Sequence, residues 1–158
     1  MRKAFAEALF KEMETDPTIY LITADLGYGL FDRIREYFPN RFFNVQAAEQ
    51  AMLGTAIGIT LQGKTAICYS ITPFLIYRPF EWIKLYLEGE GIPVKLVGSG
   101  LDDDYKKDGL SHFAFDTDKL LDLMPNIMQL NPKDYANMEV CVHHMLHNNK
   151  PTFLGLRR

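Results

Sequence analysis

Short apolar runs alternate with segments of helical spacing along the whole chain. Residues 2–14 place apolar side chains at intervals of three and four positions, which is the spacing of an amphipathic helix. The run TIYLITAD at 18–25 is short and apolar, which is typical of a strand buried on both faces. The same alternation continues to the C-terminus, so helix and strand units follow one another throughout.

The remaining elements are predicted from the same pattern and from Gly and Pro breaks. We expect strands at 41–45, 64–70, 93–99, 126–131 and 151–156, and helices at 29–37, 47–63, 78–89, 116–124 and 133–147. Strands that alternate with helices favour a parallel sheet with both faces covered. We therefore predict an α/β fold, a doubly wound and mainly parallel sheet flanked by helices, formed by residues 1–158 as a single domain.

Polar residues follow several of the predicted strands. Asp25, Glu49 and the segments 70–74 and 99–112 all come shortly after a strand ends. Doubly wound sheets bind ligands at the carboxyl ends of their strands. These residues are therefore expected to share one rim of the sheet, although they are scattered in the sequence.

Composition and charge exclude several classes of protein. The chain has 158 residues, 47% of them hydrophobic, and a formal net charge of -3, whereas nucleic-acid binding rests on a basic face. No apolar run approaches the length of a membrane span, and the acids in the first helix are foreign to a targeting peptide. Cys68 and Cys141 form no metal or redox spacing. We expect a cytoplasmic protein that binds neither nucleic acid nor membrane.

Glu49 stands alone among small and apolar residues in the stretch NVQAAEQAM at 44–52. Desolvating a carboxylate is costly, so an isolated one in such surroundings needs a reason. Gly54 and Gly58 follow on the same helix, and small residues let another element or subunit approach closely. A desolvated carboxyl there would suit proton exchange, but the dipole of a helix also stabilises a carboxylate at its start. The pattern alone leaves both interpretations open.

Three further motifs are weaker indications of a binding site. GYGLFD at 27–32 imitates a dinucleotide-binding loop, but Asp32 replaces the third glycine and would face the pyrophosphate. DYKKDG at 104–109 places a lysine at a ligand position of a calcium loop. His143 and His147 have a spacing that suits a metal, but no carboxylate follows them, and the helix dipole alone favours histidines in a last turn. No metal site is expected in this chain.

Four segments occur in an order that is specific when taken together: ITADLG, FPNRFFNVQAAEQAMLGTAIGITLQGK, RPFEWIK and DGLSHFAFDTDKLLDLMPNIMQLNP. They resemble the pyrimidine-binding domain of transketolases and the similar domain of 1-deoxyxylulose-5-phosphate synthase. The resemblance extends from Arg2 to Arg158 and implies that family's fold and its cofactor, thiamine diphosphate. In this family the Glu of AEQ, here Glu49, touches the pyrimidine ring and shares a proton with its N1′ atom, which activates C2 of the thiazolium ring.

The resemblance also implies roles for residues around the cofactor. Asp25 matches the Asp of the family's ADL segment and would lie near the cationic ring. Phe74 and Tyr77 fall in the segment that supplies aromatic walls to the pyrimidine pocket. Glu49 is thus the expected catalytic residue on the cofactor side, and His112 is the expected one on the substrate side.

Substrate contacts are implied in the same way. His112 and Asp108 match the DGxTH motif, in which His bonds to the substrate and Asp contacts its hydroxyls. Arg2 matches an arginine that contacts a sugar phosphate. Two positions depart from the family: Gly100 stands where transketolases usually carry His, and GYG replaces a phosphate-contacting Ser after ADL. We therefore expect an acceptor other than an ordinary sugar phosphate.

The chain lacks the Gly-Asp-Gly motif with a downstream Asn through which thiamine enzymes hold the metal and the diphosphate. These 158 residues also do not include the family's third, C-terminal domain. The resemblance therefore implies a second subunit that carries the diphosphate-binding domain and binds Mg²⁺. An α2β2 heterotetramer with that subunit, or a homodimer of this chain alone, is the expected assembly.

The leading hypothesis is the pyrimidine-binding subunit of a split transketolase-like enzyme. Such an enzyme transfers a two-carbon ketol or acyl unit from a ketose or 2-oxo acid donor to an aldehyde acceptor. The alternatives are a subunit of a 2-oxo acid decarboxylase or synthase, and a catalytically silent regulatory subunit, which the joint presence of Glu49, Asp25 and His112 disfavours. A flavodoxin-like nucleotide-binding protein is disfavoured by Asp32.

Overall fold

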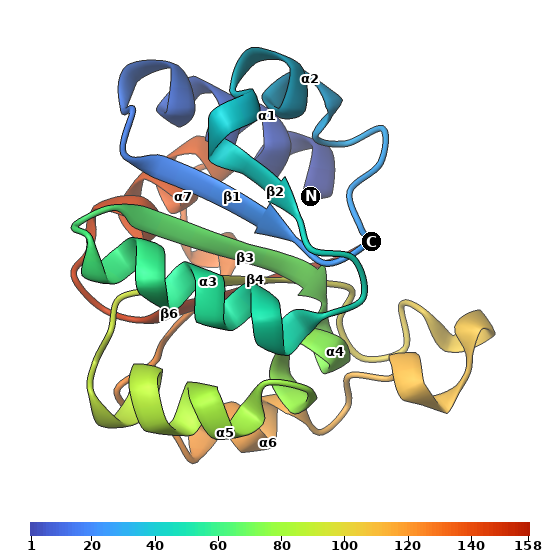
Figure 1. Cartoon of the computed structure of the whole chain (residues 1–158). Coiled ribbons are helices and arrows are strands. Elements are labelled where there is room, and N and C mark those ends of the chain that lie inside the picture. The colour runs from blue at the N-terminus through green and yellow to red at the C-terminus, as the bar shows by residue number, and fades with distance from the viewer.

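The computed structural model describes residues 1–158, which form one six-stranded sheet with helices on both faces (Figure 1). The strands are β1 (Ile19–Thr23), β2 (Phe42–Asn44), β3 (Thr65–Ile71), β4 (Lys95–Ser99), β5 (Met128–Leu130) and β6 (Thr152–Leu156). Their order is β2-β1-β3-β4-β6-β5, and every neighbouring pair is parallel. The prediction of a doubly wound sheet is confirmed, and the sheet is parallel throughout.

The helices are short, and several elements are tighter or wider than an α-helix. The α-helices are α1 (Arg2–Thr15), α2 (Asp32–Tyr37), α3 (Glu49–Leu61), α4 (Thr72–Tyr77), α5 (Phe80–Trp82), α6 (Thr117–Asp122) and α7 (Met138–His147). A π-helix, η2 (Ile83–Gly89), continues α5, and 3-10 turns form η1 (Pro39–Arg41), η3 (Lys106–Asp108), η4 (Leu110–His112) and η5 (Pro132–Asp134). None of these helices has the length and apolarity needed to cross a bilayer.

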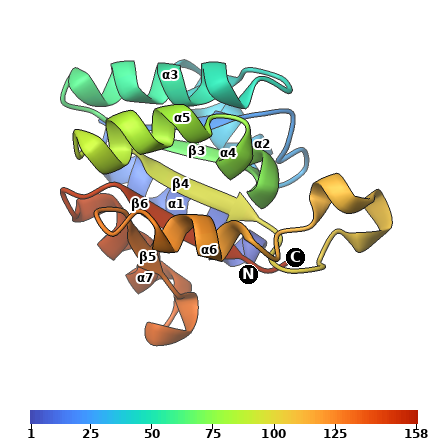
Figure 2. The same cartoon turned by 90° about the horizontal axis from the view of Figure 1, so that it is seen from below.

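Two apolar layers hold the helices against the sheet. Helices α1, α2 and α7 cover one face, where Phe5, Phe31 and Cys141 belong to one cluster of buried side chains. Helices α3, α4 and α6 with η2 cover the other face, where Met52 and Leu121 belong to the second cluster (Figure 2). Because both faces are covered, the strands can be almost entirely apolar, as their sequences are.

The structure corrects several predicted helix boundaries. The helix predicted at 133–147 begins only at Met138, because the Asn137 side chain accepts a hydrogen bond from the Val140 backbone and caps the helix there. The helix predicted at 29–37 begins at Asp32, after Gly27 and Gly29 adopt positive φ angles. Helix α4, which has a proline in its first turn, was not predicted.

The carboxyl ends of all six strands meet at one edge of the sheet, which is the right-hand edge in Figure 1. Helix α4 follows β3 at this edge. The segment 100–116, between β4 and α6, projects away from the body there and carries η3 and η4. The predicted common rim is therefore present, and an exposed arm extends from it.

A buried lysine lies at the opposite edge. Lys95 opens β4 and is 1% exposed, and its Nζ donates to the carbonyl oxygens of Asn148 (2.8 Å) and Lys150 (2.7 Å) and to Asn148 Oδ1 (3.1 Å). Burial lowers the pKa of the Lys95 ammonium from 10.5 to about 8. This side chain ties the turn after α7 to the start of β4.

Replacing Lys95 by Met is expected to remove a pH-dependent part of the stability. The folded chain releases this proton near pH 8 and the unfolded chain near 10.5, so the unfolded chain binds more protons between these values. The contribution of Lys95 to the free energy of unfolding therefore rises with pH across that window. Lys95→Met should also cost about 1–3 kcal/mol, because the hydrogen bonds from this buried ammonium to the Asn148 and Lys150 carbonyl groups are lost.

Urea unfolding of the wild type and of Lys95→Met at several pH values measures both effects. The stability difference between them should widen as the pH rises from 8 toward 10.5. Lys150→Met, in the same turn but with an exposed side chain, is the matched control and should follow the wild type. A constant difference across this window would contradict the expected titration of Lys95.

Candidate active site

Glu49 is the buried carboxylate of the rim. It is the first residue of α3, is 2% exposed and lies beside the end of β3. Ser70 Oγ donates to Glu49 Oε1 at 3.1 Å, and Arg78 Nη1 donates to Glu49 Oε2 at 2.6 Å. Both carboxylate oxygens therefore have a partner, and the arginine charge offsets the cost of burying the acid.

Arg78 is a residue of this site that the sequence did not reveal. It lies at the end of α4, and its guanidinium carbon is 3.9 Å from the centroid of the Phe74 ring. Its side chain is 44% exposed, whereas that of Glu49 is 1% exposed, so Arg78 covers the carboxylate from the solvent side. The spacing from Phe74 to Arg78 is one helical turn, which is the only signal in the sequence that could have indicated this pair.

An open cavity of about 670 Å³ lies next to this ion pair. Phe74, Tyr77 and Arg78 line it from α4, and Leu110 and Phe115 are among the residues that line it from the projecting segment. The two aromatic residues that the family resemblance assigned to a pocket wall therefore do face a common cavity. Its lining is mainly aromatic and apolar, and it opens to solvent.

Tyr77 lines this cavity, and a hydrogen bond fixes its side chain. Its hydroxyl donates a hydrogen bond to Asp116 Oδ1, just before α6. Burial and the neighbouring Asp116 carboxylate together raise the pKa of Tyr77. The bond joins α4 to the start of α6 and holds one side of the cavity.

His112 also approaches this group. Its imidazole lies edge-on to Phe74, with ring centroids 4.8 Å apart, and its Nδ1 is 3.2 Å from Ser111 Oγ. Asp108, four residues earlier, is exposed on η3 and its carboxylate makes no hydrogen bond or ion pair. The structure thus brings His112 to the aromatic wall and leaves Asp108 on the projecting arm.

Tyr105 occupies the space beside Gly100. Gly100 has a φ of +81°, and a Cβ built on it would lie 2.3 Å from Tyr105 Cε2. The Tyr105 hydroxyl is 2.8 Å from Ser99 Oγ and accepts a hydrogen bond from Arg2 Nη1 at 3.1 Å. Hence the tyrosine ring fills the place of the side chain that Gly100 lacks, and Arg2 is engaged by this chain's own hydroxyl.

Asp25 lies at the same edge but has other partners. Its φ is +48°, its backbone N–H donates to Asn44 Oδ1 at 3.0 Å, and its carboxylate accepts from the Tyr28 hydroxyl at 2.8 Å. It is exposed and does not line the cavity beside Glu49. The geometry therefore groups Glu49, Phe74, Tyr77 and His112 around Arg78 and the cavity, with Asp25, Asp108 and Arg2 at the margins.

The sequence profile described as "Transketolase, pyrimidine binding domain" matches residues 1–158. A putative transketolase C-terminal section of Methanocaldococcus jannaschii is 27% identical over 159 residues, covering 100% of this chain and 50% of that protein. A 6-deoxy-6-sulfo-D-fructose transketolase subunit of a Clostridium species is 25% identical over 159 residues, covering 100% of this chain and 49% of that protein. The chain thus spans about half the length of these curated relatives.

A solved structure is similar over the same extent. It is described as a split gene transketolase, an inactive beta4 tetramer, and it matches with a TM-score of 0.85 at 28% identity. The match covers 99% of this chain and 51% of that one. The parallel sheet and its flanking helices are therefore those of a transketolase domain.

Proposed function

Because this chain belongs to the family of transketolase pyrimidine-binding domains, we propose that it supplies the pyrimidine-binding half of a thiamine diphosphate-dependent, transketolase-like enzyme. The observation that carries the proposal is Glu49, a carboxylate 2% exposed at the ligand-binding edge of a parallel sheet. Its ion-pair partner Arg78 stacks on the Phe74 ring and lines an open cavity. The residue type and position of Glu49 are those that the family resemblance requires.

The residues fit the aminopyrimidine part of the cofactor. The buried carboxylate of Glu49 offers an acceptor oxygen, and Phe74 offers a flat apolar surface against which a ring can stack. Arg78 has to move before the pyrimidine can reach Glu49, because its Nη1 donates a hydrogen bond to Glu49 Oε2. Its half-exposed side chain at the end of a short helix can be released into solvent without disturbing the sheet.

The chemistry of this chain is then the movement of one proton. Thiamine diphosphate, when bound, supplies the electron sink for making and breaking a carbon–carbon bond next to a carbonyl. Glu49 holds a proton at the N1′ atom of the pyrimidine and takes it back, and burial keeps water from competing for that proton. Ser70 Oγ, which donates to Oε1, keeps the other oxygen of the carboxylate directed at the ring.

We propose transfer of a two-carbon ketol or acyl unit from a ketose or 2-oxo acid donor to an aldehyde acceptor. His112 and Asp108 are the proposed contacts to the substrate, and Arg2 is a third. Tyr105 fills the space beside Gly100, and its hydroxyl accepts a hydrogen bond from Arg2. Fewer groups than is usual in the family are therefore free to contact a substrate phosphate. The acceptor is therefore expected to differ from an ordinary sugar phosphate.

The diphosphate and its Mg²⁺ need residues that these 158 positions do not contain, since no Gly-Asp-Gly motif is present. We propose that a second polypeptide supplies them, in an α2β2 complex or with a homodimer of this chain as its core. The relatives described as a subunit and as a split gene product support this proposal.

The test is cofactor binding with and without that partner. Calorimetry of the purified chain with thiamine diphosphate and Mg²⁺ should detect weak or no binding, because only the pyrimidine half of the site is present. After co-expression with a Gly-Asp-Gly-bearing subunit, the complex should bind the cofactor stoichiometrically. Tight stoichiometric binding by this chain alone would contradict the need for a partner.

The same complex distinguishes the proposed reactions. Ketose donors with a panel of aldehydes and sugar phosphates test ketol transfer, and CO₂ release from pyruvate tests the alternative of a 2-oxo acid decarboxylase. A marked preference for ribose 5-phosphate as acceptor would show that Gly100 and Tyr105 do not alter the acceptor side.

A further inference from the structure

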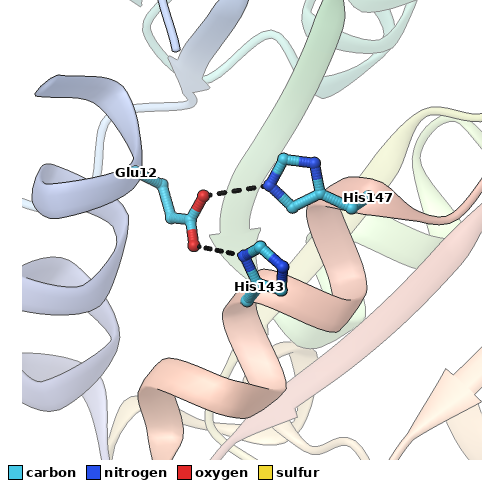
Figure 3. Close-up of side chains that lie close together, drawn as sticks. All are labelled: Glu12, His143 and His147. Atoms are coloured by element: carbon cyan, nitrogen blue, oxygen red, sulfur yellow. Dashed lines mark hydrogen bonds and ion pairs between the residues drawn. The ribbon is translucent and has the colours of Figure 1, made fainter. Parts of the chain in front are cut away.

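Helices α1 and α7 pack side by side, and three potential metal ligands meet between them (Figure 3). Glu12 Oε1 is 2.9 Å from His143 Nδ1, and Glu12 Oε2 is 3.1 Å from His147 Nε2. The carboxylate of α1 thus faces two imidazoles of α7, as the close-up shows. The cluster lies outside the candidate active site and has no part in the proposed function.

The convergence follows from helix geometry and packing. His143 and His147 are one turn apart, so their rings lie on the same face of α7, with centroids 4.2 Å apart. Glu12 lies in the last turn of α1, which covers the same face of the sheet as α7. The sequence predicted no metal site because no carboxylate follows the histidines, and the structure supplies one from 131 residues earlier.

We propose that Glu12, His143 and His147 bind a Zn²⁺ ion. The three ligand atoms lie within 4.8 Å of one another, and small rotations of the imidazoles would close this to the roughly 3.4 Å between ligands about 2.1 Å from a shared tetrahedral ion. Two neutral imidazole nitrogens and one carboxylate oxygen are a typical donor set for zinc. Mg²⁺ and Ca²⁺ are disfavoured, because they prefer oxygen ligands throughout.

Exposure of the three side chains is compatible with an accessible ion. The Glu12 side chain is 18% exposed, whereas those of His143 and His147 are 65% and 44% exposed. The carboxylate is therefore held firmly between the helices, and the imidazoles are open to an incoming ion and to a water in the fourth position. The nearby Lys11 does not oppose the ion strongly, because its ammonium is paired with Glu139 at 2.6 Å.

The site is remote from the proposed cofactor edge. Glu12 is ten residues from Arg2 along α1, which corresponds to about 15 Å of helical rise. Zinc there would join the first helix to the last one and so fix α1 against α7. Its expected role is structural, with no requirement for thiamine diphosphate.

Zinc titration of the tag-free chain, freed of metal by a chelator, tests the proposal. Calorimetry should give one Zn²⁺ per chain, and the ion should raise the melting temperature. Co²⁺ in place of zinc should give the strong visible absorption of a tetrahedral ion. Glu12→Gln, His143→Asn and His147→Asn should each weaken zinc binding by more than about tenfold, since even the loss of an outer hydrogen bond costs that much.

His144→Asn is the matched control, because His144 lies on the same helix but packs against the Tyr135 ring and not against Glu12. It should bind zinc as the wild type does. The thiols are poor competitors, since Cys68 and Cys141 are buried and burial raises the pKa of Cys141 to about 11.

Two outcomes would overturn the proposal. One is a wild-type chain that takes up no zinc, even if the three substitutions lower the melting temperature. Glu12 would then only join the two helices through hydrogen bonds. The other is equal zinc binding by the wild type and the three variants, which would place the ion elsewhere.

Discussion

Glu49→Gln is expected to slow hydrogen–deuterium exchange at C2 of bound thiamine diphosphate by roughly 10²–10⁴-fold, the usual contribution of a general acid–base group. The substitution keeps the shape of the side chain and removes the proton that Glu49 is proposed to exchange with N1′. Measuring C2 exchange in the complex with the partner subunit isolates this step from substrate chemistry.

The variant should fold and assemble. The carbonyl oxygen of the introduced amide can still accept from Arg78 Nη1, and its NH₂ group can donate to Ser70 Oγ, so both contacts of the buried side chain have a replacement. A loss of exchange therefore cannot be attributed to a collapsed site, provided that the circular dichroism spectrum and the size of the complex are unchanged.

His112→Ala is the matched control for this experiment. It should leave C2 exchange near the wild-type rate and impair turnover, because His112 is proposed to act on the substrate. Wild-type exchange in Glu49→Gln would contradict the mechanism at its centre. Glu49 would then be a carboxylate at a helix start, and a catalytically silent subunit would become the better interpretation.

Gly54→Leu is expected to destabilise the isolated chain, whereas Gly58→Leu should leave it folded and weaken its assembly. A Cβ on Gly54 would lie 2.4 Å from Cζ3 of Trp82, so a larger side chain overpacks the contact between α3 and α5 and costs about 1–3 kcal/mol or more. A Cβ on Gly58 meets nothing within 4 Å. Of the two glycines, only Gly58 is thus free to contact another subunit.

The exposed face of α3 supports the different effects expected at Gly54 and Gly58. Ala51, Thr55 and Gly58 are small, exposed and spaced at helical intervals, so another chain can approach closely along them. Denaturant unfolding of each variant reports the first effect, and size-exclusion chromatography with and without the partner reports the second. Unchanged assembly of Gly58→Leu would remove this face from the interface, and a wild-type stability of Gly54→Leu would contradict the packing against Trp82.

The order of elements and the edge at which the site lies could be predicted from the sequence. Strands such as 18–25 and 64–70 are apolar enough to be recognised as buried, and alternation with helices leaves a parallel sheet as the favoured arrangement. Parallel strands all end at one edge of the sheet. Residues that follow them, such as Glu49 and His112, can therefore be assigned to one rim from the sequence alone. Four ordered segments, the second of which contains Glu49, then carried the family resemblance.

Helix boundaries depended on finer local contacts. Asn137 caps α7 with a side-chain hydrogen bond, so that helix begins later than predicted. Pro73 lies in the first turn of α4, a helix that falls between the strand predicted at 64–70 and the helix predicted at 78–89. Hydrophobic spacing cannot show either effect, because it records which face is buried and not where the backbone donors find their partners.

Which side chains meet depended on tertiary packing. Arg78 pairs with Glu49, Arg2 bonds to the Tyr105 hydroxyl, and Glu12 faces His143. Each contact joins residues from separate parts of the fold, and the last pair is 131 positions apart. The sequence carries no periodic signal for such contacts, because each one depends on how two elements are oriented on the sheet. Helical spacing placed His143 and His147 on one face of α7, but only the packing of α1 against α7 brought a carboxylate to them.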